Sequence, residues 1–209
     1  KQQIGANIGS NGATIPSFIE INDISFENTT AGTVLDIASS QNCVFRRLGL
    51  SGSSDTAPNV VGTGETTVTI SSTAINNTKN IVFEQCDISN NVFGVVANDD
   101  MQGILFNGCY FHNLFKGVKL GETATGTGPK GLKITNGFFD NIYSTGIHSY
   151  NISGVVSAYN YFADVGNSLN GTGNPTADTI IFTGNGNTSI NDIFDRTDSD
   201  DATNPRVNL

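Results

Sequence analysis

The amino-acid sequence predicts an all-β chain that coils into a single-stranded, right-handed parallel β-helix. Two observations lead to this fold class. The composition favours turns over helices, because the chain has 24 Gly and 26 Asn among 209 residues and only 14% of its residues are charged. Exposed helix faces are usually built from Glu, Lys and Arg, so a charge content this low is unusual for a helical protein. The second observation is an internal repeat, which is the sequence signature of a solenoid.

The repeat is a ten-residue frame that reads apolar-x-apolar-x-x-small-x-apolar-x-Asn. Its six copies begin at Ile19, Cys43, Ile81, Ile104, Leu132 and Val155. The steps between these starts are 24, 38, 23, 28 and 23 residues, and the long steps carry insertions at 51–67 and 122–129. A degraded seventh copy begins near Ile181. We therefore expect about six to seven rungs of roughly 23 residues, where a rung is one turn of the solenoid.

Each rung is expected to contain three short strands. The first covers frame positions one to three and the second covers positions six to eight, because period-2 alternation puts their apolar residues on one side. The third strand begins at a Gly that lies 13 or 14 residues after the start of a copy, as at Gly94, Gly117 and Gly146. One rung cannot bury its apolar side alone, but parallel strands stacked about 4.8 Å apart form a continuous core. Aromatic side chains at one frame position would then stack along the axis.

The Asn that closes the frame is predicted to form a ladder along the solenoid. Its copies are Asn28, Asn90, Asn113 and Asn141. Asn tolerates the left-handed backbone of a sharp turn, and its amide can bond to the equivalent Asn one rung away.

The three cysteines, at 43, 86 and 109, are predicted to be buried free thiols. Cys86 and Cys109 share a frame position in consecutive copies, and a strand spacing of about 4.8 Å exceeds the usual Cβ separation of a disulfide. An odd count without a metal-ligand spacing agrees with this assignment.

Two apolar stripes are predicted on the outer surface. Frame position two is aliphatic in four of six copies, at Val44, Val82, Leu105 and Val156. Position seven is aromatic in three consecutive copies, at Tyr110, Phe138 and Tyr161. Contiguous exposed apolar stripes mark interfaces or ligand grooves, so the first is assigned to a subunit interface and the second to a glycan or interface surface. A covering loop, such as 122–129, would explain either stripe equally well.

Candidate catalytic residues are few. Solenoid glycosidases need two carboxylates that face one groove. The nearest set here is Asp99, Asp100 and Glu122, which follow third strands in neighbouring rungs. Adjacent carboxylates are also common in solvated turns, so a non-catalytic role is favoured, and no metal or cofactor is expected.

The remaining basic residues suggest no chemistry. Arg46 and Arg47 lie in a turn with no acidic run nearby, and His112 and His148 are expected on the surface without a catalytic partner. The net charge of −9 and the pI of about 4.4 exclude the basic patch that nucleic acids or anionic membranes require.

Residues 1–14 are expected to lead into a solenoid at 15–190, and 191–209 to form an acidic exit. Because the chain starts at Lys1, it is expected to be a processed or recombinant piece of a longer protein.

The rungs resemble the pectate-lyase-like family of parallel β-helices over roughly residues 15–190. That family includes lyases, hydrolases, adhesins and phage spikes, so the resemblance implies a fold and no particular activity. The Asn/Gly/Thr-rich rungs, the absence of Trp and the exit segment 194–206 look most like a bacteriophage tail spike, tail fibre or other virion appendage. This likeness implies an extracellular virion protein, a homotrimer of side-by-side β-helices and contact with host surface polysaccharide. The open alternatives are a polysaccharide depolymerase, either glycosidase or lyase, and an adhesin fragment that is secreted or on the bacterial surface.

Overall fold

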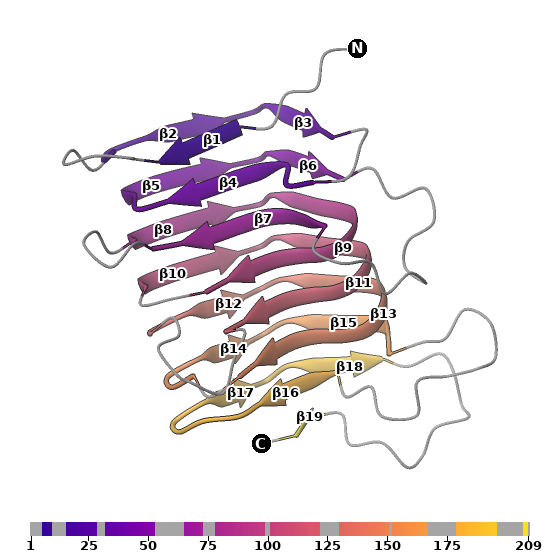
Figure 1. Cartoon of the computed structure of the whole chain (residues 1–209). Coiled ribbons are helices and arrows are strands. Elements are labelled where there is room, and N and C mark those ends of the chain that lie inside the picture. The colour runs from indigo at the N-terminus through magenta and orange to yellow at the C-terminus, as the bar shows by residue number, and fades with distance from the viewer. Residues whose placement is uncertain are drawn as a thin grey trace.

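The protein is described here from a computed structural model, which places residues 6–9, 16–28, 32–52, 65–72, 78–98, 101–121, 130–150, 152–166, 179–195 and 207–208. Every named element within these ranges is a β-strand, and every pairing between strands is parallel. The strands form a stack that runs from β1–β3 at one end to β16–β19 at the other (Figure 1). This all-β arrangement of parallel sheets fits a parallel β-helix.

A seven-stranded sheet contains the first strand of each repeat. In spatial order its strands are β17 (Thr188–Ile190), β14 (Val156–Ala158), β12 (Lys133–Thr135), β10 (Gln102–Asn107), β8 (Lys79–Glu84), β5 (Gln41–Arg46) and β2 (Glu20–Asn22). Each strand pairs in register with its own copy in the next rung. The frame therefore predicts the register of this sheet for its six copies. The seventh copy, expected near Ile181, is wrong, because Ile181 lies in β16, which pairs with β13, whereas the strand that pairs with β14 is β17.

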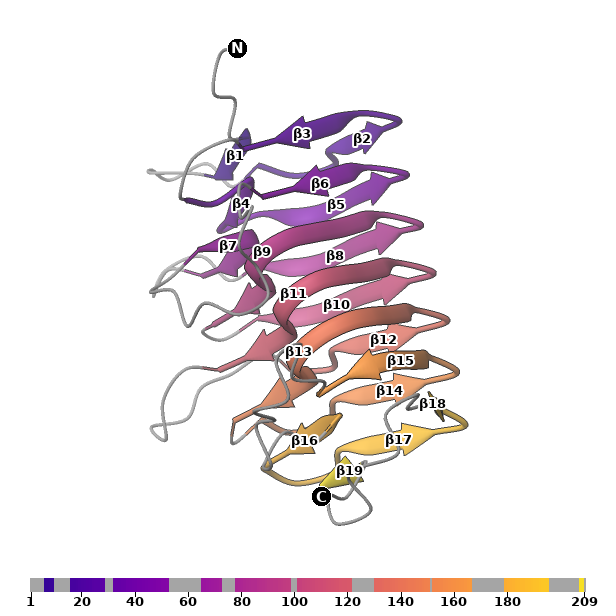
Figure 2. The same cartoon turned by 90° about the vertical axis from the view of Figure 1, so that its right-hand side faces the viewer.

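A twelve-stranded sheet contains the other strands. They are β1 (Ala6–Gly9), β3 (Ser25–Glu27), β4 (Leu35–Ala38), β6 (Gly49–Ser51), β7 (Thr66–Ser71), β9 (Asp87–Ala97), β11 (Tyr110–Leu120), β13 (Phe138–Ser149), β15 (Tyr161–Val165), β16 (Ile180–Phe182), β18 (Ile193–Asp195) and β19 (Val207–Asn208). In β9, β11 and β13 the second and third strands expected from the sequence are one continuous strand. Figure 2 shows these three strands curving from one face of the stack to the next.

The bend in these long strands coincides with the predicted asparagine ladder. Asn90, Asn113 and Asn141 have φ values of 56°, 54° and 50°, the left-handed conformation that Asn tolerates. Asn113 Nδ2 donates to Asn90 Oδ1 at 3.2 Å, and Asn141 Nδ2 donates to Asn113 Oδ1 at 2.6 Å. The ladder is confirmed for these three residues. Asn28 does not share the conformation, and Gly52 occupies its position in the next rung, where a Cβ would lie 2.4 Å from Asn90 O.

Aromatic side chains stack through the core, as the frame predicts. Two stacks form: Phe45, Phe83 and Phe106, with ring centroids 4.8 Å apart, and Phe111, Phe139, Phe162 and Phe194, with centroids 4.6, 4.6 and 5.2 Å apart. Cys43, Cys86 and Cys109 are buried and free, which confirms the assignment as thiols. The core is therefore built from columns of equivalent side chains.

The substitution Phe83→Ala tests the aromatic columns. Phe83 is fully buried between two other rings, so its removal leaves a cavity in the middle of the stack. The expected loss of unfolding free energy is about 3–5 kcal/mol in urea denaturation. Phe18→Ala is the control because Phe18 is 84% exposed and should change stability little. A similar loss of unfolding free energy in both variants would contradict the role of the stacked aromatic rings in stability.

Candidate functional site

The predicted aliphatic stripe lies on the outer side of the seven-stranded sheet. Val44 pairs in register with Val82, and Val82 pairs with Leu105, so three aliphatic side chains follow one another in adjacent strands. Lys133 separates Leu105 from Val156. The four aliphatic side chains are all partly exposed. Val44, Val82, Leu105 and Val156 are called the aliphatic row below.

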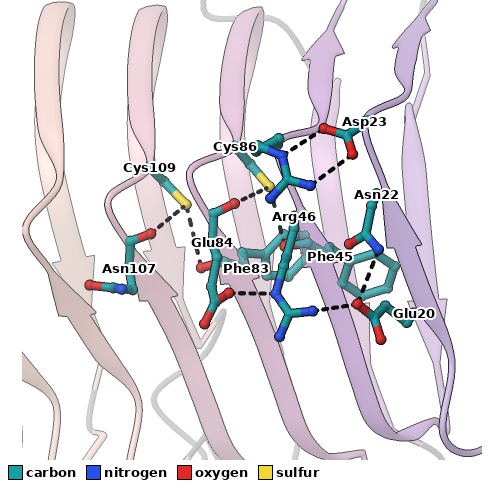
Figure 3. Close-up of polar contacts among 11 residues, drawn as sticks. Glu20, Asn22, Asp23, Phe45, Arg46, Phe83, Glu84, Cys86, Asn107 and Cys109 are labelled. Carbon is teal, nitrogen blue, oxygen red and sulfur yellow. Dashed lines mark hydrogen bonds and ion pairs between the residues drawn. The ribbon is translucent and has the colours of Figure 1, made fainter.

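Ion pairs lie two residues further along β5 and β8 than Val44 and Val82, and Figure 3 draws the pairs of Arg46. Arg46 Nε donates to Glu84 Oε2 at 2.6 Å, and Arg46 Nη1 also contacts Glu20. Arg47 binds both carboxylate oxygens of Asp23, at 2.6 and 2.7 Å. The carboxylates raise the pKa of both guanidinium groups, and the hydrogen bonds from Arg47 lower the pKa of Asp23. These pairs are exposed, so they orient charge beside the row more than they add stability.

Arg46 and Arg47 have acidic partners in the structure, although no acidic run lies near them in the sequence. Their partners come from adjacent rungs, Glu84 lying 38 residues away and Asp23 lying 24 residues away. Frame positions four and five could have revealed these pairs. Position four holds Arg46 in one copy and Glu84 in the next, and position five holds Asp23 in one copy and Arg47 in the next. In a parallel stack, residues at the same frame position of consecutive copies thus lie next to each other.

The predicted aromatic stripe lies on the outer side of β11, β13 and β15. Tyr110 pairs with Phe138 and Phe138 with Tyr161, and the ring centroids are 5.3 and 5.2 Å apart. The planes of Phe138 and Tyr161 differ by only 12°. Phe138 and Tyr161 are therefore stacked, whereas the plane of Tyr110 is tilted by 48° against that of Phe138, and Phe138 remains 39% exposed. Tyr110, Phe138 and Tyr161 are called the aromatic row below.

Carboxylates accept hydrogen bonds from the phenols of the aromatic row. Tyr110 Oη donates to Asp140 Oδ2 at 3.0 Å, and Tyr161 Oη donates to Asp195 Oδ2 at 2.6 Å. Burial and the bond to Asp140 raise the pKa of Tyr110 to about 12, so its hydroxyl stays protonated at neutral pH. The aromatic row is thus an apolar strip with acidic groups on its border.

His112 lies against the start of the aromatic row. Its Nε2 is 2.9 Å from Asp87 Oδ1, and its ring stacks on Tyr110 with centroids 4.2 Å apart. The side chain is half-buried and points outward, as expected, but it has an acidic partner that the sequence spacing did not reveal.

His148 is buried, although the sequence led us to expect it on the surface. It lies on the outer side of β13 and is only 7% exposed. Lys116 Nζ is 3.3 Å from His148 Nδ1, and the imidazole ring contacts Tyr150 with centroids 3.8 Å apart. Burial, together with the charges of Lys116 and Lys119, lowers the pKa of His148 to about 4. The ring is therefore neutral at pH 7 and can accept a hydrogen bond from Lys116. The period-2 alternation of the sequence predicts on which side of a strand a residue lies, but it does not predict whether other side chains cover that side.

The candidate catalytic residues Asp99, Asp100 and Glu122 lie outside the described residues, so their role stays a prediction. In the part of the chain that the structure describes, no group of three or more His, Cys, Asp or Glu side chains could hold a metal ion. The same ranges contain no helix long and apolar enough to cross a membrane.

Comparison with known proteins finds a distant structural likeness. No protein-family model matches the sequence, and no curated protein matches it. Among solved structures, the chain is similar to a mutant tailspike protein of the E. coli bacteriophage HK620 in complex with a pentasaccharide, with 14% sequence identity and a TM-score of 0.45. The alignment covers 91% of this chain and 41% of the tailspike chain, so this chain spans about two fifths of that protein.

The burial of His148 predicts a loss of stability in acid. Its folded-state pKa of about 4 lies below the ordinary value of 6.5, so the unfolded chain binds a proton first as the pH falls. The stabilisation is complete above pH 6.5 and is lost between pH 6.5 and 4, by up to about 3 kcal/mol. Urea unfolding of the protein and of His148→Gln across this range measures the effect. The His148→Gln variant should lose less stability than the unchanged protein as the pH falls. Equal pH dependence in both proteins would contradict the assignment.

Proposed function

We propose that this chain is a right-handed parallel β-helix of about six to seven rungs, each of roughly 23 residues, and a structural or receptor-binding segment of a bacteriophage virion appendage such as a tail spike or fibre. In this proposal it packs as a homotrimer through the aliphatic row. Its aromatic row contacts host surface glycan without cleaving it. The aliphatic row, in register over adjacent strands, is the observation that carries the proposal.

The aliphatic row suits a subunit interface better than the aromatic row does. Val44, Val82 and Leu105 carry no hydrogen-bonding group, so a second apolar surface can cover them without leaving a side-chain donor or acceptor unpaired. Such burial contributes about 25 cal/mol for each Å² removed from water. The phenols and carboxylates of the aromatic row would need partners if they were buried in the same way.

The geometry of the row also suits rotational symmetry. Because the row runs from strand to strand, it follows the axis of the solenoid. Homo-oligomers usually close through rotation axes. Three solenoids packed side by side about a common axis would each present the whole row to a neighbour. The ion pairs of Arg46 would then lie at the polar rim of the contact.

The aromatic row suits a carbohydrate that is not negatively charged. Its partly exposed rings offer apolar area to the C–H side of a sugar, and Asp140 and Asp195 can accept bonds from sugar hydroxyls. Frame positions seven and nine, which face outward on these strands, hold no Lys or Arg in any of the six copies. An acidic polysaccharide would therefore meet like charge along this surface.

Leu105→Asp tests the subunit interface. Placing a carboxylate in the aliphatic row should convert a trimer into monomers, because a charge buried there without a partner costs several kcal/mol. Sedimentation velocity at several concentrations measures the change. Ile181→Asp is the matched control, since Ile181 is a partly exposed aliphatic residue on the outer side of the other sheet. A protein that is monomeric before any substitution would exclude the homotrimer.

Phe138→Ala tests the carbohydrate contact. Binding to a panel of neutral bacterial surface polysaccharides should weaken by about two- to tenfold, since an aromatic contact contributes about 0.5–1.5 kcal/mol. Tyr159→Ala is the control because Tyr159 is 60% exposed but lies in the turn before β15, outside the aromatic row. Equal weakening in both variants would exclude the row as the contact. Release of reducing ends or unsaturated sugars would show that the chain is a depolymerase instead.

A further inference from the structure

Lys116 lies in β11, just after the bend at Asn113, among uncharged strand neighbours. In register with it are Phe93 in β9 and Thr145 in β13. Thr145 is buried, whereas Lys116 and Phe93 are partly exposed. Neither neighbour carries a negative charge that would stabilise the ammonium form of Lys116 against its partial removal from water.

The end of the Lys116 side chain contacts an imidazole and no carboxylate in the described part of the chain. Lys116 Nζ lies 3.3 Å from His148 Nδ1, and the His148 ring contacts Tyr150. Because His148 is neutral at pH 7, its Nδ1 can accept a hydrogen bond from Lys116 in either protonation state. A carboxylate would instead have favoured the charged ammonium form.

Lys119 places a second positive charge beside Lys116. Its Nζ lies 5.0 Å from the ring centroid of Phe93, the residue that is in register with Lys116. Among the residues that the structure describes, the titratable groups around Lys116 are Lys119 and His148, with Tyr150 against the imidazole. Burial and, to a smaller extent, the charge of Lys119 lower the pKa of Lys116.

These surroundings are the ones that make a lysine nucleophilic. Only the unprotonated amine has the free electron pair that attacks a carbonyl carbon, and an ordinary exposed lysine is almost entirely protonated at pH 7. Lysines that form imines are activated by removal from water or by a neighbouring cation. Lys116 has both kinds of activation, and its partial exposure leaves the amine open to a small molecule.

We propose that Lys116 is a reactive amine that forms an imine with a small aldehyde. The nitrogen attacks the carbonyl carbon, and one N–H proton moves to the carbonyl oxygen to give a carbinolamine. The hydroxyl group then leaves with the second N–H proton as water, and a C=N bond remains. Lys116 belongs to neither the aliphatic row nor the aromatic row, so this reactivity is independent of the trimer and of the glycan contact proposed above.

Reductive alkylation of the unchanged protein tests the proposal, because its other lysines are internal controls. Propanal forms the imine, and sodium cyanoborohydride reduces it to a stable secondary amine that peptide mass spectrometry locates. At pH 7 we expect Lys116 to be modified about fivefold faster than Lys79, Lys130 and Lys133. In denaturing urea the four lysines should react at similar rates, because the difference depends on the fold. A Lys116 rate equal to or below the others in the folded protein would overturn the proposal.

The substitution Lys119→Gln tests the contribution of the neighbouring charge. Removing that charge makes protonation of Lys116 easier, so the pH at which its alkylation rate is half-maximal should rise. Lys133→Gln is the matched control, since it changes the net charge equally but lies exposed on the seven-stranded sheet. It should leave the pH profile of Lys116 unchanged. An unaltered midpoint in Lys119→Gln, or an equal shift in both variants, would contradict activation by the neighbouring charge.

Discussion

In-register parallel pairing between rungs is the constraint on which the rest of the structure depends. Each strand of the seven-stranded sheet hydrogen-bonds to its own copy in the repeat, so every side chain meets the same frame position above and below. Inside, this gives columns such as Phe45, Phe83 and Phe106. At the bend it gives the asparagine ladder, in which each amide bonds to the next. A shift of one residue in the register between strands would turn the side chains of these columns outward and would also break the asparagine ladder.

The same pairing organises the outer surface into rows of different chemistry. Val44, Val82 and Leu105 form a row with no polar side-chain atom, whereas Tyr110, Phe138 and Tyr161 form a row whose phenols already bind carboxylates. Removing the first from water leaves no side-chain donor or acceptor unpaired, and the second keeps its acidic groups in contact with solvent. The two surfaces therefore differ in how many polar side-chain groups a covering partner would have to satisfy.

The stacking that gives the solenoid its stability also leaves it with ends. A column of equivalent side chains is complete only when each member has neighbours on both sides. In the last described rung Asp192 and Asn160 take the place of apolar residues in the seven-stranded sheet and bond to each other. At the other end Ile21, Ile24 and Phe26 continue the apolar columns to the surface. The chemistry of these inward positions thus differs between the first and the last described rungs.

The sequence alone predicted the parallel all-β fold, the register, the aromatic columns, the buried thiols and both outer rows, because all of these depend on equal positions in a repeat. It did not reveal the pair of His112 with Asp87, the burial of His148, or the merging of two short strands in β9, β11 and β13. Only tertiary structure decided these features. Side-chain contacts between rungs depend on rotamers and on what covers an outer face, and a periodic pattern specifies neither of them.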